Sequence, residues 1–105
     1  MNTVPLVQSM LARDYNYDVK VVEHHEKEGV LPRLSLMVYD TRNGLAVVTL
    51  EKSEAWGISD VKTNNDYRNV KWPRDLKAAP NETGAVELVK TIMDSISTFD
   101  KERVK

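Results

Sequence analysis

Hydrophobic and polar residues alternate along residues 34–50 in two runs, which flank a short polar segment ending in Asn43-Gly44. Alternation with a period of two is typical of a strand with one buried face, and Asn-Gly is typical of a hairpin loop because both residues tolerate positive φ. The stretch therefore predicts an antiparallel β-hairpin. The predicted pairing places the following side chains on one face of it: Leu34, Leu36, Val38, Val47 and Thr49.

Apolar residues recur every three to four positions in two other segments. Residues 4–11 predict a short N-terminal helix that Thr3 caps, and residues 85–99 predict a long C-terminal helix. Asn81 and Thr83 are alternative N-caps for the second helix. Its continuous apolar stripe is what a helix needs in order to cover one face of a sheet.

Residues 17–26 predict a further strand, with Tyr17 and Val21 on one face, followed by a charged run that contains His24 and His25 and is expected to form a solvated turn. Residues 55–58 predict a fourth, short strand or an edge. The fold class is therefore α+β, with a three- or four-stranded antiparallel meander and helices on one face, in a single domain of residues 1–105.

A sheet covered by helices on one face leaves the other face solvated or available to a partner. The side chains predicted on that second face are Lys20, Val22, Met37, Tyr39, Ala46 and Val48. An exposed sheet face with this many apolar groups favours binding or self-association, so Met37, Tyr39 and Val48 are secondary candidates for partner binding.

The amino-acid composition excludes several kinds of functional site. The chain has 105 residues with 15 basic and 16 acidic side chains, a formal net charge of -1 and no cysteine. Disulfides, thiolate metal sites and a cysteine nucleophile are therefore excluded, and a reducing, cytoplasmic location is expected. No apolar run approaches the ~20 residues that span a bilayer, so no membrane association is expected. Any basic surface must be local, because the charges nearly balance.

The strongest candidate site is residues 62–77, where five basic side chains outnumber two acidic ones and aromatic residues lie between them. Arginine with tyrosine or tryptophan dominates protein–protein hot spots, whereas cations with stacked aromatics also bind single-stranded nucleic acid. A third interpretation is that the aromatic residues fold back onto the core and the charges are only solvated. The candidate partner-binding residues are Tyr67, Arg68, Lys71, Trp72 and Arg74.

The sequence contains no strong pattern for a metal site or for a catalytic site. His24 and His25 lie among glutamates, but adjacent residues of a strand point to opposite faces and cannot both bind one ion, so no metal site is predicted. Carboxylates such as Glu51 and Asp60 have no distinctive context, and no glycine-rich phosphate loop is present. We therefore expect neither a cofactor nor an enzyme.

The expected function is a small non-catalytic protein-binding regulator or inhibitor that acts stoichiometrically on a larger partner. In general type the chain resembles the small binding proteins common in bacteria and their phages. A protein partner is favoured, and a homodimer is an open possibility. The alternatives are a nucleic-acid-binding module that uses residues 62–77 and a small enzyme whose site is shared across a dimer.

Overall fold

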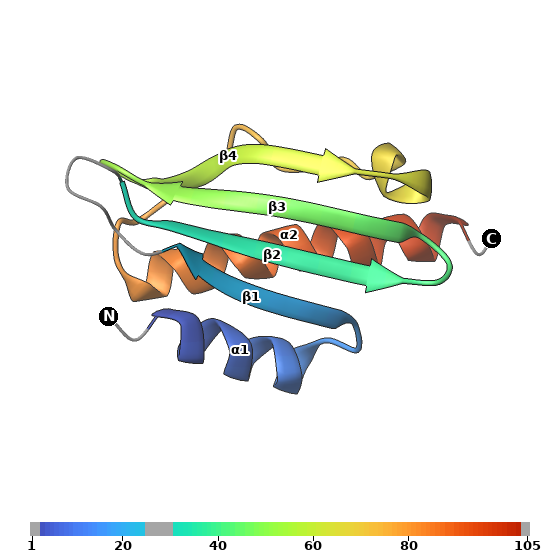
Figure 1. Cartoon of the computed structure of the whole chain (residues 1–105), viewed down its shortest axis with the longest axis horizontal. Helices are drawn as coiled ribbons and strands as arrows, with labels where there is room; N and C mark the ends of the chain where they lie inside the picture. The colour runs from blue at the N-terminus through green and yellow to red at the C-terminus, as the bar shows by residue number, and fades with distance from the viewer. Residues whose placement is uncertain (1–2, 25–30, 104–105) are drawn as a thin grey trace.

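The computed structural model describes residues 3–24 and 31–103. A sheet forms one layer and helices form the other (Figure 1). The elements in chain order are α1 (Thr3–Asp14), β1 (Asp18–His24), β2 (Arg33–Asp40), β3 (Gly44–Lys52), β4 (Trp56–Thr63), the 3₁₀ helix η1 (Asn65–Asn69), β5 (Lys77–Ala78) and α2 (Glu82–Arg103).

The sheet is a simple antiparallel meander. Within the described residues it has five strands in the order β1-β2-β3-β4-β5. The predicted α+β class, with a short N-terminal helix and a long C-terminal helix, is confirmed, whereas the strand number is five rather than three or four. The sequence pattern missed β5 because two residues carry no periodicity, and Lys77 joins the sheet by pairing with Gly57 of β4.

The hairpin between β2 and β3 has a three-residue loop. Asp40 pairs with Gly44, and Gly44 has a φ of 100°. The Asp40 carboxylate accepts a 2.5 Å hydrogen bond from the backbone N–H of Asn43, a local turn that holds three residues in the loop instead of two. Only Gly44 therefore needs the positive φ that the Asn-Gly pair predicted.

This loop shifts the pairing by one residue from the prediction. Leu36 pairs with Val48 and Val38 with Ala46, so Val47 lies on the opposite face. A shift of one residue exchanges the two faces of a strand. Val48 and Ala46 are 0% exposed, and the prediction that they lie on the open sheet face is wrong.

The strand β1 extends to His24, inside the predicted strand range of 17–26, and His24 is exposed as predicted, but it belongs to a strand and not to a turn. Its Nε2 atom lies 2.7 Å from the Ser35 hydroxyl, which in turn lies 3.1 Å from the Thr49 hydroxyl. The three polar side chains thus satisfy one another across β1, β2 and β3. His25 lies outside the described residues.

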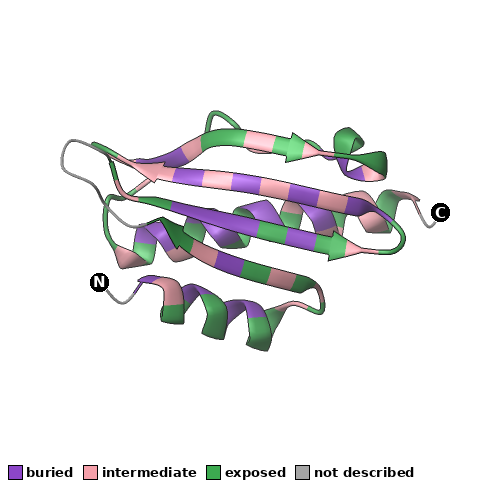
Figure 2. Ribbon diagram, in the orientation of Figure 1, coloured by how far each residue is buried: buried purple, intermediate pink, exposed green. Residues whose placement is uncertain are grey.

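The core lies between the sheet and the helices (Figure 2). Buried and more exposed residues alternate along β3, as expected for a strand with one covered face. The apolar stripe of α2 is buried as predicted as far as Ile96, while Phe99 is only partly buried. In α1, Val7, Met10 and Leu11 are buried, whereas Leu6 is 44% exposed.

One of the two predicted N-caps of α2 is observed in the structure. The Asn81 side-chain oxygen accepts a 2.8 Å hydrogen bond from the Gly84 N–H, so Asn81 caps the helix. None of the described helices is long and apolar enough to cross a membrane.

Candidate functional site

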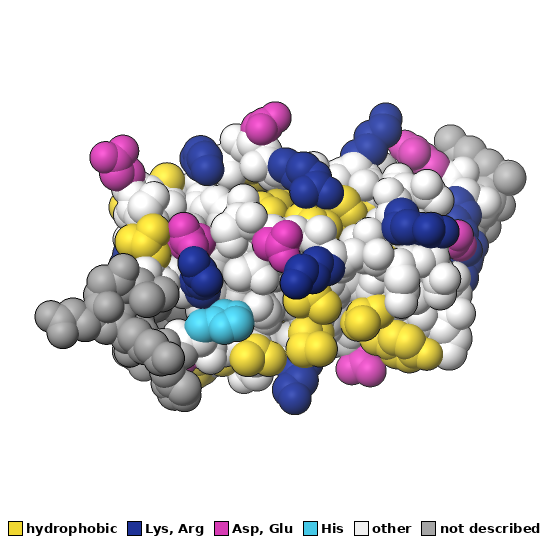
Figure 3. Space-filling model, turned by 45° about the horizontal axis from the view of Figure 1, so that its top comes forward, with side chains coloured by type: hydrophobic (Ala, Val, Ile, Leu, Met, Phe, Trp, Pro, Cys, Tyr) yellow, Lys and Arg dark blue, Asp and Glu magenta, His cyan; other side chains and the backbone are white. Residues whose placement is uncertain are grey.

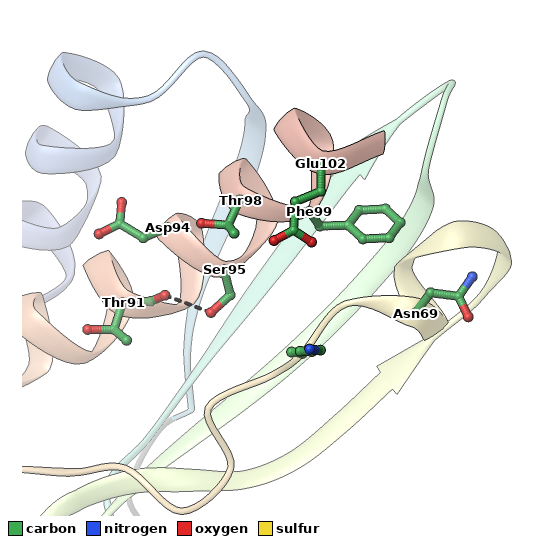
Figure 4. A pocket seen from close by; sticks show the side chains of 8 residues that line it. Asn69, Thr91, Asp94, Ser95, Thr98, Phe99 and Glu102 are labelled. Carbon is green, nitrogen blue, oxygen red and sulfur yellow. Dashed lines mark hydrogen bonds between the residues drawn. The ribbon is translucent and has the colours of Figure 1, made fainter. Parts of the chain in front are cut away.

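A groove with a volume of about 290 Å³ lies between residues 69–71 and the outward side of α2 (Figure 4). It belongs to the helix layer, because α2 forms one of its walls. The lining residues are Asn69, Lys71, Thr91, Asp94, Ser95, Thr98, Phe99 and Glu102.

The α2 wall combines one aromatic ring with hydrogen-bond acceptors. Figure 4 shows the Phe99 ring reaching from α2 toward the side on which Asn69 lies. The Thr91 and Ser95 hydroxyls donate 3.0 Å hydrogen bonds to the carbonyls of Glu87 and Thr91. Because their protons are used within the helix, these hydroxyls offer mainly acceptor lone pairs to a ligand.

The charged side chains of the groove are not equally available. The Asp94 carboxylate accepts a 2.6 Å hydrogen bond from the Tyr15 hydroxyl and points away from the cavity (Figure 4). Lys71 and Glu102 are exposed on opposite walls, and within the described part of the chain neither has an ion-pair partner. A ligand in the groove therefore meets one available cation and one available anion beside an aromatic ring.

Tyr67, a predicted partner-binding residue, is 0% exposed and takes no part in the surface. Its hydroxyl donates a 2.6 Å hydrogen bond to Asp40, and its backbone N–H donates to the Asn43 carbonyl at 3.1 Å. Burial, followed by the hydrogen bond to Asp40, raises the pKa of Tyr67. The prediction that Tyr67 is available for direct contact with a partner is wrong, because the tyrosine joins residues 65–69 to the β2–β3 hairpin.

Trp72 is partly buried against Tyr67. Its indole N–H donates to the Tyr67 carbonyl at 3.2 Å, and the two ring centroids are 6.2 Å apart with an interplanar angle of 42°. Val70 between them is 5% exposed. The interpretation in which the aromatic residues fold back onto the core is thus confirmed for Tyr67, and Trp72 has only part of its surface available.

The predicted segment does not form one continuous surface. Lys62 lies on the open face of the sheet opposite Val47, and Lys77 lies in β5. The remaining predicted cations, Arg68, Lys71 and Arg74, are exposed, and Lys71 lines the groove. We call these three residues the basic rim.

Polar side chains connect the β2–β3 hairpin with the C-terminal turns of α2. Asn43 is 1% exposed and donates to the Asp100 carboxylate at 2.9 Å, while its side-chain oxygen accepts a hydrogen bond from Arg103. The Tyr17 hydroxyl donates to Asp100 at 2.5 Å, and Arg103 also forms a 2.9 Å ion pair with Asp66. This network links the hairpin, η1 and the last turns of α2.

Sequence reasoning missed this network, although one signal was present. Asp100 and Arg103 follow Ile96 by four and seven residues, so they continue the buried stripe of α2 with polar groups. Polar residues on the inner face of a helix require partners. The partner, Asn43, was assigned only to the hairpin loop.

The open face of the sheet carries the secondary candidates. Met37 and Tyr39 are 36% and 51% exposed, as predicted, and Leu45 and Val47 of β3 lie opposite them. Figure 3 shows hydrophobic side chains on this side of the molecule, separated by basic and acidic groups. Val48 does not belong to this face.

Within the described residues, no group of three or more histidine, aspartate or glutamate side chains is arranged to hold a metal ion. Comparison of the chain with protein-family models, with curated proteins and with solved structures finds no match.

Proposed function

We propose that this protein is a non-catalytic protein-binding regulator that acts stoichiometrically and holds its partner at the groove beside α2. The observation that carries the proposal is the position of the partly buried Phe99 ring in a groove whose facing wall carries Lys71 of the basic rim. An apolar anchor inside a charged border is the usual anatomy of a protein interface.

The charges define the chemistry of the partner. The basic rim presents Arg68, Lys71 and Arg74, and the neighbouring Asp66 is already paired with Arg103. The matching surface is an acidic protein segment that inserts one apolar side chain against Phe99. Glu102 favours a hydrogen-bond donor on that segment, close to the inserted side chain.

Two observations favour this function over the alternatives. Stacking of nucleic-acid bases needs exposed aromatic faces, whereas Tyr67 is buried and Trp72 packs against it. In the groove, the Thr91 and Ser95 hydroxyls donate to helix carbonyls and not to a general base, an arrangement that favours binding over catalysis.

The test is photocrosslinking in a lysate treated with nuclease. A photoreactive residue replaces Thr98 in the groove or, in the control protein, Thr49 on the open sheet face. We expect one protein adduct from position 98 that Lys71→Glu and Arg74→Glu abolish and that the matched control Lys62→Glu leaves intact. Adducts that disappear with nuclease would support nucleic-acid binding instead, and an adduct insensitive to Lys71→Glu would overturn the groove proposal.

A further inference from the structure

The open sheet face has an apolar square at the end next to the β2–β3 hairpin. Met37 pairs with Val47 and Tyr39 pairs with Leu45, so these four side chains form two adjacent columns on β2 and β3. We call these four residues the apolar square. The core lies between the helices and the other side of the sheet, and Met37 and Tyr39 of the square are exposed.

Opposite charges lie beside the square on β1. Asp18 pairs with Tyr39 and Lys20 pairs with Met37, so each column of the square continues into one charged residue. Both charged side chains are exposed, and in the described part of the chain neither forms an ion pair.

We propose that the occupant of this face is a second copy of the same chain, packed sheet against sheet around a two-fold axis that runs across the strands above Val38 and Ala46. That rotation exchanges the two columns. Tyr39 then faces Met37 of the second copy, and Leu45 faces Val47 of the second copy. Such self-complementary contacts are the requirement for an isologous dimer.

The same rotation pairs the charges reciprocally. Asp18 faces Lys20 of the second copy, and Lys20 faces Asp18 of the second copy. Packed sheets lie about 10 Å apart, a gap that a lysine and an aspartate side chain together can bridge. The alternative axis, parallel to the strands, would place Lys20 against Lys62 of the second copy and bring like charges together. The charges therefore favour the axis that runs across the strands over the axis parallel to them.

The size of the face sets the strength of the dimer. Strands β1 to β4 lie about 4.8 Å apart, and the axis above Val38 and Ala46 superposes only about two of the roughly four outward side chains of each strand, so the overlap covers roughly 250 Å². A standard interface buries about 800 Å² on each partner. The overlap is about a third of that area, so the dimer is weak, and we expect a dissociation constant in the high micromolar range.

This arrangement leaves the groove of each copy on the outside of the dimer, because α2 lies on the opposite side of the sheet. The dimer does not depend on the proposed function of the groove. If both hold, one dimer presents two grooves and binds a repeated partner with avidity.

The test is sedimentation equilibrium of the full chain over a concentration range from micromolar to about one millimolar, chosen to bracket the expected dissociation constant. We expect a reversible monomer–dimer equilibrium. Asp18→Lys and Lys20→Asp each place like charges against one another and should weaken the dimer at least about tenfold. The double variant Asp18→Lys/Lys20→Asp restores opposite charges and should return to within about threefold of the native protein.

Two further variants complete the experiment. Met37→Asp should abolish the dimer, and the matched control Arg68→Asp in the basic rim should leave it unchanged, with far-ultraviolet circular dichroism reporting that each variant is folded. A native chain that is monomeric throughout, or a double variant as weak as the single ones, would overturn the proposal. Neither result bears on crosslinking at the groove, so the two proposals fail separately.

Discussion

The hydroxyl of Tyr67 donates a 2.6 Å hydrogen bond to the carboxylate of Asp40. These residues belong to η1 and to the end of β2, and neither element pairs with the other in the sheet. The contact fixes residues 65–69 against the hairpin, and those residues lead directly into the wall of the groove. The aromatic ring predicted to bind a partner therefore supports the site from inside.

Tyr67→Phe tests this supporting role. The substitution keeps the ring and removes one hydrogen bond to a partly buried carboxylate, so the free energy of unfolding should fall by about 1.5–3 kcal/mol. Urea denaturation measures the change. Tyr39→Phe on the open face is the control and should alter the same quantity by less than about 0.5 kcal/mol. Equal effects of the two variants would contradict the buried role of Tyr67.

The register of the hairpin is tested by a matched pair of substitutions on adjacent residues of β3. Val48 is buried and Val47 is on the open face, so Val48→Thr places a hydroxyl in the core. We expect Val48→Thr to lower the free energy of unfolding by about 1–3 kcal/mol and Val47→Thr by less than about 0.5 kcal/mol. If Val47→Thr lowered the free energy of unfolding more than Val48→Thr, Val47 would be the buried residue, as the alternation alone predicts.

Gly84 tests the close approach between α2 and the preceding segment. A Cβ atom at this position would lie 1.8 Å from the carbonyl oxygen of Ala79, and this backbone must move to accommodate it. Alanine normally favours a helix, but here Gly84→Ala should lower the free energy of unfolding by about 1–3 kcal/mol. Glu87→Ala, at an exposed position of the same helix, should have little effect. A stabilising Gly84→Ala substitution would contradict the contact.

At alkaline pH, deprotonation of the Tyr17 hydroxyl should break its hydrogen bond to Asp100. Burial, followed by the hydrogen bond to Asp100, raises the pKa of Tyr17 from 10.0 to about 12. The contribution of the neutral hydroxyl to stability is fully present below the pKa of the unfolded chain, about 10, and is lost as the pH rises through 12, because only the unfolded state releases its proton in that window.

Denaturation at fixed pH values from 9 upward measures this loss, where pH 9 lies about one unit below the ordinary tyrosine pKa. Tyr17→Phe should reduce the slope of stability against pH in that window. An unchanged slope in Tyr17→Phe would show that the hydroxyl does not remain protonated in the folded state.

Periodicity along the chain was sufficient to predict the α+β class, the meander and the two helices. The stripe of α2 from Ala85 to Ile96 and the alternation of β2 are local patterns, because burial on one side of a regular element repeats with the period of its backbone. The exposure of Met37 and Tyr39 followed from the same alternation. Arg68, Lys71 and Arg74 were correctly expected at the surface from their charge alone.

Other features depended on contacts between distant residues. The face on which Val48 lies was set by one hydrogen bond from the Asn43 backbone to Asp40, since a single extra residue in a loop reverses every side chain beyond it. Tyr67 is buried because Asp40 and Asn43, more than twenty residues earlier, provide its partners. Arg103 of α2 forms an ion pair with Asp66 of η1, two elements that are more than thirty residues apart in the chain. Local sequence thus determined the elements, whereas the tertiary structure decided the register of β3 and which polar groups meet, because both depend on contacts between residues far apart in the chain.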